Sequence, residues 1–128
     1  MAKRIVAIDD DTVFLNLLHD LLTEEGYDTH LCKEGTASYA EVKKLDPDAM
    51  ILDIRMEHPD EGWQMLEILK LDPVLTTKPI IVCSADLPAL QDRSTFLKGK
   101  HCEILPKPFN LDDLLTLLRQ LVGGPESE

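Results

Sequence analysis

Five short segments typical of strands divide the chain of 128 residues, and segments with helical periodicity lie between them. Most of these strands are apolar runs, but the second, residues 29–32, is more polar and is expected near an edge of the sheet. A short apolar run fits a strand that is buried on both faces, and such strands alternating with helices are typical of a parallel sheet. Right-handed crossovers leave few topologies, so we predict a doubly wound α/β fold with strand order 2-1-3-4-5 and five helices. The predicted strands are residues 4–8, 29–32, 49–52, 79–83 and 102–105.

The segments between the strands place apolar residues at helical spacing. The first segment starts after Asp11 and ends at Gly26, because glycine readily takes the left-handed conformation that follows many helices. The second, residues 35–44, is a weak helix with Ala37 and Ala40 as its only clear inward candidates. The other inward residues are Phe14, Leu17, Leu18, Leu21 and Leu22 in the first helix, Trp63, Leu66 and Leu69 in residues 62–71, Leu90 and Leu97 in residues 87–98, and Leu111, Leu114, Leu115, Leu118 and Leu121 after the N-cap Asn110.

Composition limits the function classes that fit this chain. The net charge of −11 argues against direct binding of nucleic acid by this domain and against docking on an anionic membrane. No apolar run approaches the roughly 20 residues that span a bilayer, and the run near the N-terminus is too short for a signal peptide. Cys32, Cys83 and Cys102 lack the spacing of a zinc site, so we expect reduced thiols in a cytoplasmic protein. Residues 1–122 form one predicted domain, and residues 123–128 a disordered tail or linker stub.

Carboxylates follow two of the predicted strands at their carboxyl ends. Asp9, Asp10 and Asp11 follow the first strand, and Asp53 follows the third. In parallel α/β sheets, ligands bind outside the carboxyl ends of the strands, at the point where the strand order reverses. With the order 2-1-3-4-5 the first and third strands are neighbours, so Asp9, Asp10 and Asp53 should share one crevice. Like charges in such a crevice make sense if a divalent cation lies between them.

A hydroxyl and an ammonium group complete this edge, because Ser84 follows the fourth predicted strand and Lys107 the fifth. Mg²⁺ takes about six oxygen ligands and usually only one or two carboxylates beside water and phosphate. A cation and a lysine neutralise phosphoryl oxygens, a hydroxyl donates to one of them, and a carboxylate can be the nucleophile. The set predicts Mg²⁺-dependent phosphoryl transfer. A Gly-rich phosphate loop is lacking, so a nucleotide is not the obvious ligand.

Each of these residues also has an ordinary structural explanation. Asp11 fits the start of a helix, where a carboxylate is favourable, and Asp53 could be a turn residue. Ser84 could cap a helix, and Lys107 could be a surface lysine. The functional interpretation depends on all of them standing at the ends of the correct strands, which chance rarely produces.

Over residues 3–122 the chain resembles the receiver domains of bacterial two-component response regulators. The resemblance implies a flavodoxin-like (CheY-like) fold and a signalling role, with no enzymatic activity beyond Mg²⁺-dependent self-phosphorylation and self-dephosphorylation. The motifs that carry it, in this order and at these spacings, are Ile8-Asp9-Asp10, the segment Met50-Ile51-Leu52-Asp53-Ile54-Arg55-Met56, Val82-Cys83-Ser84-Ala85 and Lys107-Pro108-Phe109.

The resemblance also implies roles for single residues. Asp53 would be the phosphoacceptor and would receive a phosphoryl group from a phosphohistidine of a sensor histidine kinase or of a histidine phosphotransfer protein. Asp10 would bind Mg²⁺ directly, Asp9 would assist through water, and the backbone carbonyl of Arg55 would supply another ligand beside Asp53. The residues that hold the phosphoryl oxygens would be Ser84 and Lys107.

The same resemblance implies an output surface. The chain also differs from the family pattern at Ile104 and in the loop after Asp53. The surface of helix 4 (residues 87–98), strand 5 (residues 102–105) and helix 5, which follows Asn110, would signal to a downstream protein target or output domain, and it would also serve a homodimer. Ile104 occupies the position where the family usually has a tyrosine or phenylalanine that rotates with the switch. The loop after Asp53 is about one residue longer than usual, with its proline displaced to Pro59.

Two alternatives remain open from the residues. Asp9-x-Asp11 resembles the first motif of haloacid-dehalogenase-type phosphatases, in which Asp9 would be the nucleophile and Asp11 the general acid. That interpretation leaves Asp53 without a role. The second alternative is a receiver-like domain that binds a partner without switching, which the intact set of site residues argues against and Ile104 mildly favours.

Overall fold

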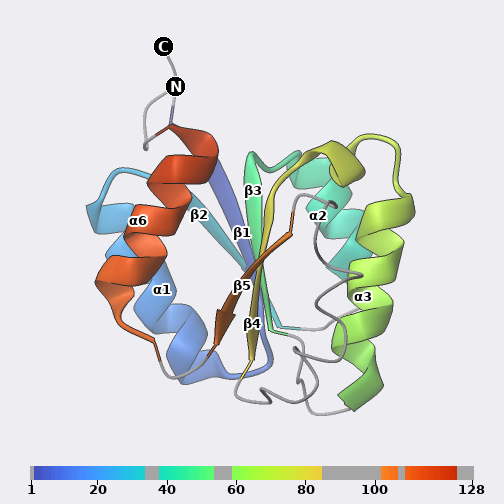
Figure 1. The fold of residues 1–128 in the computed structure, drawn as a ribbon, viewed down its shortest axis with the longest axis horizontal. Helices are drawn as coiled ribbons and strands as arrows, with labels where there is room; N and C mark the ends of the chain where they lie inside the picture. Colours follow the sequence, from blue (N-terminus) through green and yellow to red (C-terminus); the bar gives the residue numbers. More distant parts are fainter. Residues whose placement is uncertain (1, 34–37, 54–58, 85–101, 107–108, 124–128) are drawn as a thin grey trace.

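Five parallel strands form one sheet in the order β2-β1-β3-β4-β5, as predicted (Figure 1). The computed structural model describes residues 2–33, 38–53, 59–84, 102–106 and 109–123. Each strand begins and ends within one residue of its predicted bounds. The strands are β1 (Arg4–Ile8), β2 (Asp28–Cys32), β3 (Ala49–Asp53), β4 (Ile80–Ser84) and β5 (Cys102–Pro106).

Helices cover both faces of the sheet in the described part of the chain. Two of them, α1 and α6, lie on one face, and α2 and α3 lie on the other (Figure 1). The predicted helix over residues 87–98 lies outside the described residues. Among the helices that are described, none is long and apolar enough to cross a membrane. The helical elements are α1 (Thr12–Glu24), α2 (Tyr39–Leu45), α3 (Pro59–Leu71), the 3₁₀ turn η2 (Leu75–Thr77) and α6 (Leu111–Val122).

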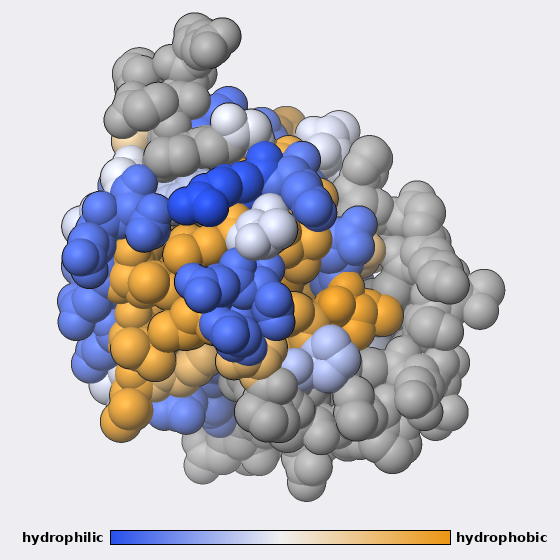
Figure 2. Space-filling view, turned by 60° about the vertical axis from the view of Figure 1, so that its left-hand side comes forward, coloured by the Kyte–Doolittle hydropathy of each residue, from blue (hydrophilic) through white to orange (hydrophobic). Residues whose placement is uncertain are grey.

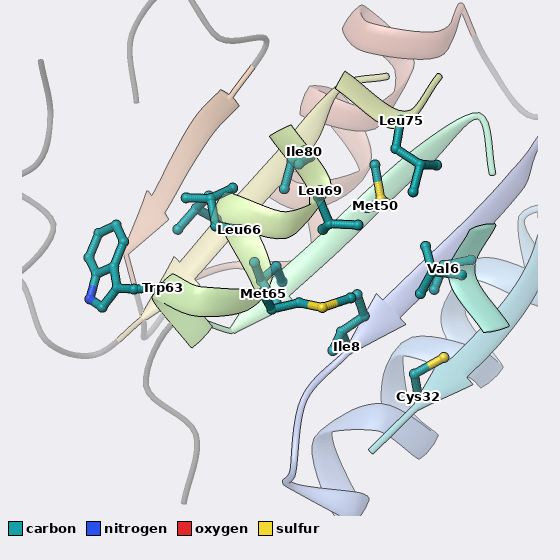
Figure 3. Packing of buried hydrophobic residues seen from close by; sticks show 13 residues of the cluster. Val6, Ile8, Cys32, Met50, Trp63, Met65, Leu66, Leu69, Leu75 and Ile80 are labelled. Atoms are coloured by element: carbon teal, nitrogen blue, oxygen red, sulfur yellow. The ribbon is translucent and has the colours of Figure 1, made fainter. Parts of the chain in front are cut away.

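Two apolar clusters, one on each face of the sheet, form the core. Ile5 and Ala7 of β1 point into the α1–α6 cluster, whereas Val6 and Ile8 point into the α2–α3 cluster. All four side chains are fully buried, which explains why this strand is apolar without alternation. Figure 3 shows the second cluster, in which α3 packs onto β1, β3 and β4 through Met65, Leu66 and Leu69.

The buried face of α1 differs from the predicted one. Leu18 and Leu22 are buried as expected, but Leu15 is buried as well, whereas Leu17 is 48% exposed. The rest of the predicted stripe is partly buried. Apolar residues occupy more of this helix than the sheet can cover, so their spacing alone does not decide which of them turn inward.

The end of α1 is as predicted and has a clear geometry. Gly26 lies at φ 102°, in the left-handed region that glycine adopts without steric cost. The Gly26 amide donates to the Thr23 carbonyl at 3.0 Å, and the Tyr27 amide donates to the Leu22 carbonyl at 2.9 Å. This pair of hydrogen bonds is a Schellman motif, which turns the chain from α1 into β2.

Helix α2 is shorter than predicted and buries a different residue. It begins at Tyr39, and its single buried residue is Val42. Ala40 is exposed, so its predicted inward position was wrong, and Ala37 lies outside the described residues. A helix of seven residues makes only about two turns, so one large side chain is enough to fill its contact with the sheet.

Helices α3 and α6 bury the faces predicted for them. Helix α3 begins at Pro59, before the predicted residue 62, because proline suits the first turn of a helix, where its missing N–H has no partner to lose. Asn110 caps α6 as predicted, since its Oδ1 accepts the Asp112 amide at 2.8 Å. The predicted residues that are buried are Trp63, Leu66, Leu69, Leu114, Leu115 and Leu118, while Leu111 and Leu121 are partly buried.

Asp72, which follows α3, joins this helix to α2. Its carboxylate accepts the Tyr39 hydroxyl at 2.5 Å and lies 3.0 Å from the Lys43 ammonium group. Its other oxygen accepts the amides of Val74 and Leu75 at 2.9 and 3.0 Å. These contacts, led by the Tyr39 hydrogen bond, hold the pKa of Asp72 well below its usual range. The carboxylate therefore stabilises the fold in its charged form.

Acid should weaken this junction. Because the pKa of Asp72 is lower in the folded than in the unfolded chain, its contribution is complete above the unfolded value of about 4 and declines as pH falls below it. We expect Asp72→Asn to be less stable than the wild type at pH 7, with a difference that shrinks in urea unfolding curves measured towards pH 3. Tyr39→Phe removes the largest cause of the lowered pKa of Asp72. Its stability difference from the wild type should also shrink towards pH 3, but by less than that of Asp72→Asn. A difference that stays constant with pH would contradict this account.

Candidate functional site

The carboxyl ends of β1 and β3 bring three carboxylates together. Ile8 pairs in register with Leu52, so Asp9 and Asp53, the next residues along each chain segment, lie at the same edge of the sheet. Carboxylate oxygens of Asp9, Asp10 and Asp53 lie within 4.8 Å of one another. Asp9 is 2% exposed and Asp53 is 7% exposed, while Asp10 is partly exposed. The structure therefore brings these three carboxylates together at one edge of the sheet, as the sequence predicted.

Backbone hydrogen bonds orient Asp9. Its Oδ1 accepts the amide of Asp11 at 2.9 Å, and its own amide donates to the Cys32 carbonyl at the end of β2, 3.1 Å away. The first bond fixes the rotamer of the carboxylate, and the second fixes its backbone against the neighbouring strand. The Cys32 carbonyl is a contribution that sequence patterns do not indicate, because any residue at that position supplies the same atom.

Asp11 has the helix-capping role that was expected of it. Its Oδ1 accepts the amides of Val13 and Phe14 at 3.1 and 3.2 Å, and its backbone is extended, as an N-cap requires. These bonds use the carboxylate to satisfy the first turn of α1. The three consecutive aspartates thus have different environments. Asp9 and Asp10 belong to the carboxylate cluster with Asp53, whereas Asp11 caps α1.

The electrostatics of the crevice suit a cation. Two unit charges that lie no more than 4.8 Å apart in a medium of effective dielectric constant about 20 repel by about 3.5 kcal/mol or more, and a third carboxylate adds to this cost. A divalent ion between them converts the repulsion into attraction. The ligand atoms are carboxylate oxygens, which Mg²⁺ and Ca²⁺ prefer, and the set contains neither histidine nor cysteine, which transition metals favour. The donor set fits Mg²⁺.

Of the other predicted site residues, only Ser84 lies within the described part of the chain. Ser84 is the last residue of β4 and pairs in register with Pro106, which directly precedes Lys107. Lys107 itself and Arg55 lie outside the described residues. Because β4 and β5 run parallel to β3, their carboxyl ends lie at the same edge of the sheet as the carboxylates. The positions of Ser84 and Lys107 at the site therefore stay predictions from topology.

Comparison with known proteins identifies the family. The sequence model of the response regulator receiver domain matches residues 5–119. The chain belongs to this family, the receiver domains of two-component systems. The transcriptional regulatory protein TcrA of Mycobacterium tuberculosis is 35% identical over 118 residues, which are 92% of this chain and 45% of that protein. The response regulator MprA of Mycobacterium bovis is 31% identical over 128 residues, which are 100% of this chain and 54% of MprA. The chain thus spans about half the length of these relatives.

Solved structures agree with the fold. A CheY-like receiver domain protein from Methanospirillum hungatei superposes with a TM-score of 0.82 and 26% identity, covering 96% of this chain and 95% of that one. The receiver domain of the sensor histidine kinase PA1611 from Pseudomonas aeruginosa gives a TM-score of 0.80 at 22% identity, covering 97% and 100%. That structure has a magnesium ion coordinated in its active site cleft. The predicted flavodoxin-like, CheY-like architecture is confirmed.

Proposed function

We propose that this domain accepts a phosphoryl group on the carboxylate of Asp53. The observation that carries the proposal is the cluster of Asp9, Asp10 and Asp53 at the ends of β1 and β3 in a chain of the receiver family. The donor is a phosphohistidine of a sensor histidine kinase or of a histidine phosphotransfer protein. This assignment gives the reactive role to Asp53, whereas the phosphatase alternative leaves a buried carboxylate of the cluster without a function.

The transfer needs one bond to form and one to break. An oxygen of Asp53 attacks the phosphorus, the P–N bond of the phosphohistidine breaks, and the imidazole leaves with the bonding electron pair and takes up a proton. Asp10, Asp53 and the Arg55 carbonyl would hold Mg²⁺, with Asp9 assisting through water. A bound Mg²⁺ would neutralise charge on the phosphoryl oxygens. The groups that would hold those oxygens directly are the Ser84 hydroxyl and the Lys107 ammonium group.

The phosphorylated domain would signal by a change of shape and not by catalysis on another substrate. Its only reactions would be its own phosphorylation and dephosphorylation. We assign the output to the surface of the predicted helix over residues 87–98, β5 and α6, which would contact a downstream target, an output domain or a second copy. Ile104 of β5 is half-buried and packs against the α2–α3 cluster, so an aliphatic side chain would transmit the change there. The protein would work in the cytoplasm, where kinase domains supply phosphohistidine. Residues 1–122 would form the receiver domain, and residues 123–128 would be a tail or linker.

A labelling experiment tests the acceptor. With Mg²⁺ and radiolabelled acetyl phosphate as donor, the wild-type chain should become labelled, and Asp53→Asn should not. Asp20→Asn is the matched control, because it removes the same charge at an exposed position of α1. A phosphatase of the alternative type would behave differently, since Asp53→Asn would keep its label and Asp9→Asn would lose it. A chain without any label under these conditions would favour a receiver-like domain that does not switch.

The donor must cover the surface next to Asp53. Helix α1 starts beside the crevice and exposes two large apolar side chains, Val13 and Leu17, which are 78% and 48% exposed. They lie four residues apart, on one side of the helix. Figure 2, in which the side of the molecule that carries α1 and α6 is turned forward, shows apolar side chains among hydrophilic ones. We include this face of α1 in the contact with the protein that carries the phosphohistidine.

Leu17→Asp should therefore separate protein donors from small ones. We expect about 10-fold slower transfer from an autophosphorylated kinase that labels the wild type, because an apolar contact in an interface is replaced by a charge. Labelling by acetyl phosphate should be unchanged. The control is Leu71→Asp, which makes the same change at an 82% exposed leucine at the far end of α3. The α1 contact would be contradicted if Leu71→Asp slowed transfer from the kinase as much as Leu17→Asp does. It would also be contradicted if Leu17→Asp slowed labelling by acetyl phosphate as much as transfer from the kinase.

A further inference from the structure

An aromatic contact joins the first turn of α1 to the residues just before α6. The rings of Phe14 and Phe109 meet edge to face, with centroids 6.0 Å apart and planes at 78°. Phe14 lies in the first turn of α1, and Phe109 stands between Lys107-Pro108 and the N-cap Asn110. Both rings are partly buried and pack against the α1–α6 cluster. The contact therefore ties the start of α1 to the start of α6.

Two hydrogen bonds connect Phe14 to Asp11 and Asp11 to Asp9. The Phe14 amide donates to Oδ1 of Asp11, and the Asp11 amide donates to Oδ1 of Asp9. Three neighbouring residues, Asp9, Asp10 and Asp11, thus form a short loop whose far end is fixed by the first turn of α1. A shift of Phe14 would move this turn and, through these two bonds, the carboxylate of Asp9. On the other side, Phe109 is only two residues from Lys107.

We propose that Phe14 and Phe109 are a positioning pair, which holds the loop of Asp9 and Asp10 in register with the connection between β5 and α6. The inference rests on the proposed magnesium site. An edge-to-face pair constrains both distance and angle, whereas aliphatic side chains of similar size can slide past each other. Without the rings, the carboxylates spend less time in the arrangement that binds the ion, and Mg²⁺ affinity falls.

Calorimetric titration of Mg²⁺ tests this role, with Phe14→Leu, Phe109→Leu and the double variant compared with the wild type. Partners that orient metal ligands typically contribute about 10-fold or more to affinity, so we expect each single variant to bind Mg²⁺ about 10-fold more weakly. The double variant should bind no more weakly than either single one, because the two rings act as one unit. Phe109→Tyr keeps the ring and should restore wild-type affinity. Phe109→Met, which keeps most of the volume, replaces Phe109→Leu if the latter does not fold.

Tyr27→Leu separates positioning from packing. Tyr27 is a buried aromatic residue of the same cluster, but it lies beyond the other end of α1, after Gly26. Its loss should lower the melting temperature without changing Mg²⁺ affinity. If Phe14→Leu and Phe109→Leu likewise reduce only stability, the positioning role is overturned while the magnesium site stands. A wild-type chain that does not bind Mg²⁺ overturns the proposed site and this inference together.

Discussion

Asp10→Asn is expected to weaken Mg²⁺ binding by at least about 100-fold and to slow phosphoryl labelling to a similar degree. The variant removes one carboxylate charge from the cluster of Asp9, Asp10 and Asp53. We propose that this carboxylate binds the ion directly. Loss of a partner that only orients a ligand already costs about 10- to 100-fold in affinity, so loss of a ligand should cost at least the upper end of that range. Calorimetric titration gives the affinity directly.

Asp11→Asn is the matched control for this prediction. It removes the same charge one residue away, while asparagine still caps α1 and the backbone amide still donates to Asp9. Mg²⁺ should also raise the melting temperature of the wild type and of Asp11→Asn, because an ion that binds only the folded state stabilises it, and it should have little effect on Asp10→Asn. Equal loss of affinity in both variants would mean that the net charge of the loop, and not ligation by Asp10, determines binding.

Leu18→Ala should lower the free energy of unfolding by about 3 kcal/mol, because truncation of a fully buried leucine removes apolar contact and leaves a cavity. Leu17→Ala, the same change one residue earlier, should cost less than about 1 kcal/mol, since that side chain is 48% exposed. Urea unfolding of both variants measures the two values. Similar losses would show that α1 packs with the face predicted from its periodicity and not with the face found in the structure.

The sheet was predictable because its strands carry their own signal. β1 and β3 are apolar at successive positions and pack into both clusters, so each appears in the sequence as an unbroken apolar run. Handedness and strand number then leave the order 2-1-3-4-5 as the natural arrangement. The order in turn brings Asp53 beside Asp9 and Asp10. The sequence alone therefore assigns Asp9 and Asp53, which are 44 positions apart in the chain, to one site.

Helix orientation was less predictable, because it depends on partners that are distant in sequence. In α1, Leu15 and Leu17 are equally apolar, and only the position of the sheet and α6 decides that Leu15 is covered. In α2, Val42 is buried and Ala40 is not, because contact is made by one face of a very short helix. The contacts of Asp72 with Tyr39 and Lys43 could not be inferred either, since nothing in a local pattern pairs residues of different helices.

The most direct test of the central claim is chemical mapping of the phosphorylated residue. Sodium borohydride reduces an aspartyl phosphate to homoserine, and peptide mass spectrometry then locates the modified position. For the chain labelled by acetyl phosphate with Mg²⁺, we predict homoserine at position 53, with Asp9 and Asp10 unchanged. Homoserine at position 9 with Asp53 intact, or the absence of homoserine from a chain that binds Mg²⁺, would contradict the account.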